Sequence, residues 1–516
     1  MDIRKDIKIT VVLSDEKSNE LLNVKKERSA IVTHDFSTTI MSTLIKNKLI
    51  DGSFCGGRGD CGRCRVQFLE GVTLPTSLER SIMTAEELRK GYRLACMARP
   101  KDDCVIRLAL MEEKKIAIIT DMMHVTQEND PLGQRKTDSA NRKAPVSNTG
   151  VFDMDETMIA VDLGTTTIAM QLMEIGTGHI IDTYCEMNPQ RAYGSDVLSR
   201  IQASCEGKRE VLQQLVIGVL ERGVVRFRGR VHSIRCMCIA GNTTMEHLLM
   251  GYDVLSLGKS PFVPVEIGLQ EYRSEKWEFP VWITPGITAF VGGDIVSGLY
   301  ALNMLPGNTV TKVRMLIDLG TNGEMAITDG IEMTVTATAA GPAFEGGAGA
   351  GIIGSDMIAN AATLLQRGIL DETGLLEEPY FTEGIIVGEP PVRMDNKDIR
   401  DLQMAKAAVR AGVEILWKKM GCPEIDQIYL AGGFGCYLDV EAAFQIGLLP
   451  EWMRGKVSAA GNTSLAGAYH IGCDLLQGRI SKESLEQRLS SVTSINLAGQ
   501  KAFEGLYIQY MDLRFL

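Results

Sequence analysis

The feature that most constrains this chain is the stretch Cys55-Gly-Gly-Arg-Gly-Asp-Cys61-Gly-Arg-Cys64, with a further cysteine in Arg93-Leu-Ala-Cys96. Its glycines lack a Cβ and accept positive φ, so the backbone can approach the sulfur atoms closely. Thiolates in such a loop suit iron, because amide N–H groups directed at the sulfurs help to set the potential of a cluster. The pattern therefore predicts an iron–sulfur site held by Cys55, Cys61, Cys64 and Cys96.

The spacing resembles that of a plant-type ferredoxin domain, in which Cys-x4-Cys-x2-Cys and a distant fourth cysteine hold a [2Fe–2S] cluster. Here the first gap is one residue longer. A zinc site would bring a second Cys-x2-Cys pair or closely spaced histidines, and a disulfide knot would need an oxidising compartment. Cys104 is a rival to Cys96, but it opens an apolar strand, where a buried structural thiol is the commoner outcome.

Length and composition exclude several classes of protein. A chain of 516 residues predicts two to four domains, and 45% hydrophobic with 23% charged residues is typical of a globular protein. No apolar run reaches the 18 or more residues of a membrane span, and the N-terminus lacks an apolar signal core, so we expect a cytoplasmic protein with no membrane contact. A net charge of −11 argues against nucleic acid as a partner.

Residues 1–115 are expected to form a small β-grasp domain around the cysteines. Ile7–Leu13 alternates as a strand does, and Arg65–Gly71 predicts a second strand that ends in a turn. Thr38–Leu49 has a helical pattern, with Ser37 or Thr38 as its N-cap. Thr84-Ala-Glu-Glu87 is a capping box, which predicts the start of another helix.

Residues 116–155 are polar and nearly free of apolar side chains, which predicts a flexible linker. A coil of about 30 residues spans on the order of 30 Å. That reach would let the cluster domain move between two docking surfaces. The alternative is a partly ordered strap on the protein surface.

Residues 156–516 read as α/β, and their length exceeds one core, so two lobes are expected. An internal echo supports duplication. Asp162-Leu-Gly-Thr returns as Asp318-Leu-Gly-Thr, and Ala240-Gly-Asn-Thr-Thr244 returns as Ala460-Gly-Asn-Thr-Ser464. In the second pair, each Asn is suited to cap the helix that follows.

Each Asp-Leu-Gly-Thr comes where an apolar strand ends, an arrangement that suits a bound phosphate. A carboxylate there can hold a hydrated Mg²⁺, while glycine leaves space and the backbone N–H and hydroxyl groups can donate to phosphate oxygens. Two such turns facing one another would clamp a polyphosphate. The predicted residues are Asp162, Gly164, Thr165 and Thr166 in the first turn, and Asp318, Gly320, Thr321 and Asn322 in the second.

A late strand that ends in Gly432-Gly433 before a helix resembles the adenosine-binding turn of the actin-like ATPases. With a ferredoxin-like unit in front, the whole chain resembles the reductive activators of corrinoid enzymes. The resemblance extends over Asn188-Pro-Gln, Tyr193-Gly-Ser-Asp-Val-Leu-Ser-Arg200, Ala240-Gly-Asn-Thr-Thr-Met, Phe290-Val-Gly-Gly-Asp294 and Ala340-Gly-Pro-Ala-Phe-Glu345-Gly.

This resemblance implies a [2Fe–2S] domain fused to an actin-like (ASKHA) ATPase domain that spends ATP to reduce cob(II)alamin to cob(I)alamin for methyl transfer. Partners would be a corrinoid protein and a low-potential donor such as ferredoxin or flavodoxin, and a homodimer is possible. The residues with implied roles are Asp162 and Asp318 for Mg²⁺ and phosphate, Gly432 and Gly433 for the nucleoside, and Glu345 and Asp294 for orienting water or closing the cleft.

Longer members of this family carry an additional middle domain, and we expect only the polar linker in its place here. Two other functions stay open: a nucleotide-switched binding protein that does not itself donate electrons, and a small-molecule kinase, which no acceptor-substrate motif supports. Gly349-Ala-Gly-Ile-Ile-Gly354 fits a dinucleotide motif but has no strand leading into it. Cys236 and Cys238 are expected in a buried strand, and His247 on a helix.

Overall fold

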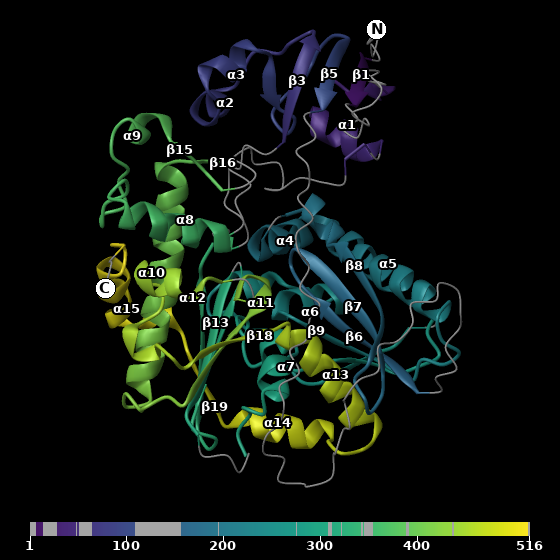
Figure 1. The fold of residues 1–516 in the computed structure, drawn as a ribbon. Coiled ribbons are helices and arrows are strands. Elements are labelled where there is room, and N and C mark those ends of the chain that lie inside the picture. The colour runs from purple at the N-terminus through teal and green to yellow at the C-terminus, as the bar shows by residue number, and fades with distance from the viewer. Residues whose placement is uncertain are drawn as a thin grey trace, which may run out of the picture.

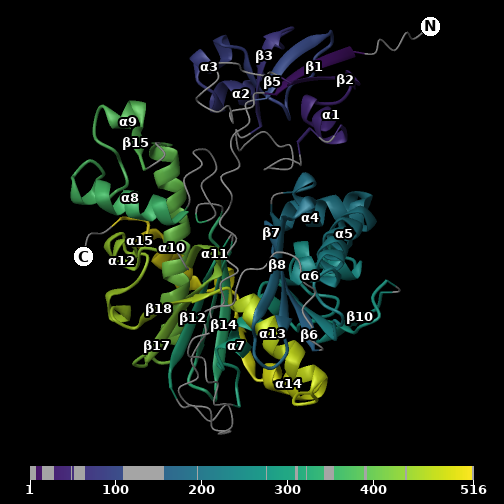
Figure 2. The ribbon, with the colours of Figure 1, turned by 45° about the vertical axis from the view of Figure 1, so that its right-hand side comes forward.

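The computed structural model of the protein consists of a small N-terminal unit and two larger lobes. In Figures 1 and 2 the lobes lie side by side, with α7 (Gly293–Ala301) and α13 (Thr463–Leu476) between them. No described helix combines the length and the apolar character needed to cross a membrane. The linker predicted over 116–155 lies outside the described residues, which are 7–13, 28–47, 49–50, 64–108, 156–194, 196–274, 276–307, 312–320, 322–341, 344, 354–388, 392–435 and 438–513.

The N-terminal unit is a five-stranded mixed sheet of order β2-β1-β5-β3-β4. Its first and last strands in sequence, β1 and β5, pair in parallel at the centre, and β1 pairs antiparallel with β2. Alternate residues of these strands fill one core with the helix α1. The predicted β-grasp unit is confirmed, with β1 Ile7–Leu13, β2 Arg28–His34, α1 Ile40–Lys46, β3 Arg65–Glu70, α2 Ser77–Ile82, α3 Ala85–Arg89, β4 Tyr92–Leu94 and β5 Cys104–Leu108.

The predicted start of the first helix is wrong by one or two residues. Thr39 is the N-cap of α1, and its side chain accepts a hydrogen bond from the Ser42 N–H. Ser37 instead donates to the carboxylate of Asp35, and Thr38 donates to the Asp35 carbonyl. These side chains therefore close a turn before the helix. The capping box at Thr84 and Glu87 is confirmed.

The first lobe is built on a six-stranded sheet of order β10-β11-β9-β6-β7-β8. One face is covered by α4, α5 and α6, whose apolar residues join the core of the lobe. Every residue of β9 is buried, which confirms the expectation for Cys236 and Cys238. The elements are β6 Thr157–Leu163, β7 Thr167–Glu174, β8 Ile180–Met187, η1 Pro189–Ala192, α4 Val197–Ala203, η2 Ser204–Lys208, α5 Arg209–Arg228, β9 Cys236–Gly241, α6 Thr243–Met250, η3 Leu255–Gly258, β10 Gln270–Tyr272 and β11 Val281–Ile283.

The second lobe repeats this plan with a sheet of order β18-β17-β12-β13-β14-β19. Helix α10 runs beside β13 and β14, and α8, α9, β15 and β16 extend the lobe toward the N-terminal unit in both views. Its elements are β12 Arg314–Leu319, β13 Asn322–Thr328, β14 Met333–Ala339, α8 Gly354–Gln366, α9 Tyr380–Glu383, β15 Ile385–Val387, β16 Val392–Met394, α10 Asn396–Lys419, β17 Gln427–Ala431, α11 Gly432–Gly435, α12 Val440–Gln445, η4 Glu451–Met453, β18 Val457–Gly461, α14 Lys482–Ser490, β19 Val492–Ile495, η5 Leu497–Gly499 and α15 Lys501–Gln509.

The helices α7 and α13 pack on different sheets. Apolar residues of α7 pack on the second sheet, whereas those of α13 pack on β6 and β9 of the first. The two helices touch at Gly467, where a Cβ would lie 1.9 Å from the Ser297 carbonyl oxygen. The two lobes are therefore joined through a close helix contact that a side chain at this position would disrupt.

Candidate nucleotide and cluster sites

The structure brings three of the predicted aspartates close to one another where the two lobes meet. Asp162 ends β6, Asp318 ends β12, and Asp294 lies in the first turn of α7. Each of these residues is half-buried. Burial, followed by the charges of Asp294 and Asp162, raises the pKa of Asp318 to about 7. Burial and then Asp162 raise the pKa of Asp294.

Asp162 links the two lobes directly. Its Oδ2 accepts a hydrogen bond from Asn462 Nδ2 at 2.9 Å, and its Oδ1 accepts one from Ser464 Oγ at 3.0 Å. Burial raises the pKa of Asp162, while these two hydrogen bonds act to lower it. Asn462 also caps α13, as predicted, through the Leu465 N–H. A carboxylate of the first lobe thus holds the start of a helix that leaves the second.

The first phosphate turn, residues 164–166, is held by side chains from several elements. Gly164 is required because a Cβ there would lie 2.6 Å from the Thr167 carbonyl oxygen. Asn242, the predicted cap of α6, donates from Nδ2 to Thr165 Oγ1 at 2.9 Å and accepts from the Met245 N–H. The helix cap and the turn are therefore one connected unit.

The second turn and the glycine pair lie close to Asp318. The Gly320 N–H donates to the Asn322 carbonyl at 2.9 Å. Gly432 has φ +83°, and a Cβ on it would lie 2.5 Å from Asp318 Oδ1, so glycine lets the start of α11 approach the carboxylate. Gly433 follows in α11. Thr321 and Glu345 lie outside the described residues, and their roles stay predictions.

Two buried acids next to the motifs were missed by sequence reasoning. Burial and then Asp294 raise the pKa of Glu246 well above its usual range. Burial, then Asp294 and Asp318, do the same for Glu324. Each lies a few residues after one of the repeated motifs. This position was the only signal in the sequence that could have identified these acids. In the described part of the chain, no three acidic, His or Cys side chains are grouped so that they could hold a metal ion.

Two of the four predicted cluster ligands meet in the N-terminal unit. Cys64 Sγ and Cys96 Sγ are 3.2 Å apart, too far for a disulfide and close enough to share a metal centre. The Ala95 N–H donates to the Cys64 carbonyl at 2.7 Å, which holds the two segments together. Cys55 and Cys61 lie outside the described residues. Cys104 is buried in β5, and burial followed by Asp103 raises the pKa of its thiol to about 11, as a structural thiol requires.

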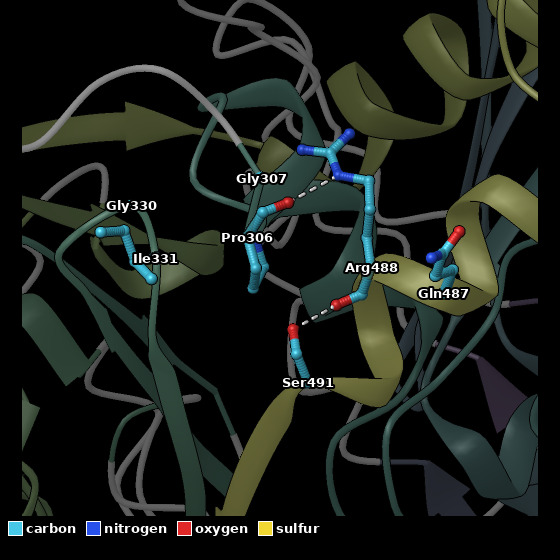
Figure 3. A pocket seen from close by; sticks show the side chains of 7 residues that line it. All are labelled: Pro306, Gly307, Gly330, Ile331, Gln487, Arg488 and Ser491. Carbon is cyan, nitrogen blue, oxygen red and sulfur yellow. Dashed lines mark hydrogen bonds between the residues drawn. The ribbon is translucent and has the colours of Figure 1, made fainter.

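A pocket of about 440 Å³ lies elsewhere, at one end of α14 (Figure 3). Arg488 Nε donates to the Pro306 carbonyl at 2.8 Å, and Ser491 Oγ donates to the Arg488 carbonyl. The lining, which also includes Gly307, Gly330, Ile331 and Gln487, contains no carboxylate. This pocket is separate from the acidic cleft.

Three sequence profiles of protein families match successive parts of the chain. A 2Fe-2S iron–sulfur cluster binding domain matches residues 24–101. The RACo middle region matches residues 157–306, and the C-terminal domain of RACo, the ASKHA domain, matches 312–350 and 348–515. The middle region of that family is thus the first lobe, so the expectation that a middle domain is missing here does not hold for the region this profile describes.

Curated relatives and a solved structure agree with these profiles. The corrinoid activation enzyme RamQ of Eubacterium limosum is 28% identical over 60% of this chain and 63% of its own length. A Co(II) methylated amine-specific corrinoid protein reductase of Methanosarcina barkeri is 21% identical over 60% of this chain and 68% of its own. A solved reductive activator for a corrinoid, iron–sulfur protein is 25% identical, with TM-score 0.60, and covers 98% of each chain. The chain thus spans about two thirds of these curated relatives.

Proposed function

This chain belongs to the family of reductive activators of corrinoid proteins, and we propose that it couples ATP to the transfer of one electron from an N-terminal [2Fe–2S] cluster to cob(II)alamin. The observation that carries the proposal is the joint presence, in one chain, of neighbouring thiols at Cys64 and Cys96 and a cluster of three aspartates where the two lobes meet. A redox centre and a polyphosphate site in one chain suit a reaction that needs both.

The energetics explain why ATP would be needed. Plant-type clusters have reduction potentials of about −400 mV, and the reduction potential of the cob(II)alamin/cob(I)alamin couple is expected to be lower. An electron moved uphill by about 100 mV costs about 2.3 kcal/mol. A nucleotide that binds one arrangement of the lobes more tightly can supply this difference when that arrangement favours reduction of the partner.

The residues of the chain divide this work. Cys64 and Cys96, with the predicted Cys55 and Cys61, would hold the cluster, which supplies one electron when bound. Asp318 must lose its proton before it can hold Mg²⁺ and its water ligands, and its raised pKa keeps that step near neutral pH. Asp294, which lies near it, would orient the attacking water or close the site. Asp162, bonded to the start of α13, would relay the state of the phosphate turn to the second lobe.

The direct test mixes the reduced protein with a cob(II)alamin protein, with and without MgATP, and follows the absorbance of cob(I)alamin. We expect reduction with MgATP and little without it. Equal reduction in both samples would contradict the coupling. Iron and sulfide analysis, with an EPR spectrum of the reduced protein, tests the cluster independently.

The variant C64S separates this function from a nucleotide switch that is not an electron donor. It leaves the ATP cleft unchanged, so nucleotide binding should persist. Electron transfer should be lost if the cluster is the donor. Retained transfer from an external donor would favour the switch.

A further inference from the structure

The segment from Asn188 to Arg200 contacts the phosphate turn in a way that the proposed function does not explain. Asn188 and Arg200 are 1% and 0% exposed. Arg200 Nη2 donates to the Thr165 carbonyl at 2.5 Å, and Asn188 Nδ2 donates to the Gly164 carbonyl at 2.9 Å. Two successive carbonyl groups of the turn are therefore held by two buried side chains, which we call the bracket.

Both residues of the bracket make further hydrogen bonds that hold their side chains in place. Asn188 Oδ1 accepts the Gln190 N–H, and the Asn188 N–H donates to the Thr166 carbonyl at 2.9 Å. The Arg200 guanidinium also donates to the Gln190 side chain and to the Gly194 carbonyl. A Cβ on Gly194 would lie 2.3 Å from Ser199 Oγ, so only glycine fits there. Both donors are thus fixed before any ligand arrives.

Holding these carbonyls also sets the direction of the amide protons. A trans peptide is planar, so the N–H of each residue points opposite to the preceding carbonyl. With the Gly164 and Thr165 carbonyls turned to the bracket, the N–H groups of Thr165 and Thr166 point away from it. Consecutive N–H groups that converge on one side form an anion-binding nest.

That side is the one on which the three aspartates lie near one another. Successive side chains of a strand face opposite sides of its sheet. Leu163 packs in the core with Ile201 of α4, on the side of the bracket, whereas Asp162 bonds to α13 on the other side. Amide groups directed away from α4 therefore face the side where the aspartates gather.

We propose that Asn188 and Arg200 are positioning residues that preset the turn 164–166 as a nest for the terminal phosphates of a nucleotide. The inference rests on the proposed ATP site. It adds the two residues that set the shape of the first of its two turns, residues 164–166. A rigid fork suits this task better than a flexible amine, because several donors of the guanidinium act in fixed directions.

The variants R200K and N188D test the bracket, and R222K is the matched control. R200K keeps the positive charge but loses the planar guanidinium group with its several donors. N188D keeps the oxygen that caps Gln190 but loses the donor to Gly164. Arg222 lies in the same lobe, is 53% exposed and pairs with Glu186 of β8. We expect the dissociation constant of MgATP to rise roughly ten- to hundredfold in R200K and N188D, the range for hydrogen bonds with charged groups.

R222K should bind MgATP as the wild type does, and kcat at saturating MgATP should change less than KM in the bracket variants. Folding is checked by the melting temperature and by the visible spectrum of the cluster, and N188D decides if R200K does not fold. Wild-type affinity in folded N188D or R200K would overturn the proposal.

Amide hydrogen exchange of residues 163–170 without nucleotide gives a second readout that does not depend on ATP. Faster exchange confined to this peptide in R200K, but not in R222K, would support the bracket. Unchanged exchange would overturn it. A wild type that binds no MgATP while showing this difference would contradict the proposed function and leave the bracket supported.

Discussion

At the scale of residues, buried carboxylates dominate the cleft. Like charges gathered in a poorly solvated place resist ionisation, which is why the pKa of Asp318 rises to about 7. A cluster of this kind destabilises the nucleotide-free protein and becomes favourable when a cation arrives. The carboxylates that are proposed to bind Mg²⁺ and phosphate therefore lower the stability of the nucleotide-free protein.

The first prediction concerns D318N. Because the folded pKa of Asp318 is above its unfolded value, the folded state binds the extra proton, and stability falls as pH rises from about 4 to about 7. At pH 8 the nucleotide-free D318N protein should therefore be more stable than the wild type, by up to about 4 kcal/mol. The gain should shrink at pH 5. Thermal melting at both pH values measures it.

The same variant should lose MgATP affinity by tenfold or more, since the carboxylate proposed to hold Mg²⁺ is removed. E424Q is the control, because this side chain is 89% exposed and lies outside the cleft. D318N and wild-type proteins that melt alike at both pH values would contradict the assignment of a buried charge.

At the scale of elements, the contact between α7 and α13 joins the two lobes. Gly467 allows the helix backbones to touch at Ser297, and Gly298 opposes Thr463 in the same contact. Closely packed helices slide or rotate between discrete arrangements and do not deform continuously. The absence of a side chain on each helix is therefore what makes this contact compact.

The second prediction concerns G467A. The added methyl group would overlap the Ser297 carbonyl, and overpacking of this kind destabilises by about 3 kcal/mol. The melting temperature should drop by several degrees. G505A in α15 meets nothing within 4 Å and should be neutral or slightly stabilising. Equal effects of the two variants would show that the helix contact does not determine stability.

At the scale of the whole molecule, the proposed coupling of nucleotide binding to reduction of a partner requires a connection between the two lobes. The bonds from Asn462 and Ser464 to Asp162 are such a crossing, between residues 300 and 302 positions apart. Asn462 also caps α13, but Ser464 makes its bond without that second role. Ser464 is therefore the cleaner residue for testing the relay.

The third prediction concerns S464A. Removing one of two hydrogen bonds to Asp162 should leave MgATP affinity within a fewfold of the wild type, since the phosphate turn is intact. The stimulation of cob(II)alamin reduction by MgATP should decrease more than the affinity. Binding titration and the cob(I)alamin assay measure the two quantities. A parallel loss of both would assign Ser464 to the nucleotide site and not to the relay.

The sequence by itself determined what depends on neighbours along the chain: the capping of helices by Asn242 and Asn462, the turn after the first Asp-Leu-Gly and the duplicated halves. These follow from spacing and local hydrogen bonds. Only the tertiary structure decided that Asp162 bonds to α13, that Glu246 and Glu324 join the acidic cleft, and that Arg200 lies beneath the phosphate turn. Such contacts join residues far apart in sequence, and their energies depend on burial, which local pattern does not reveal.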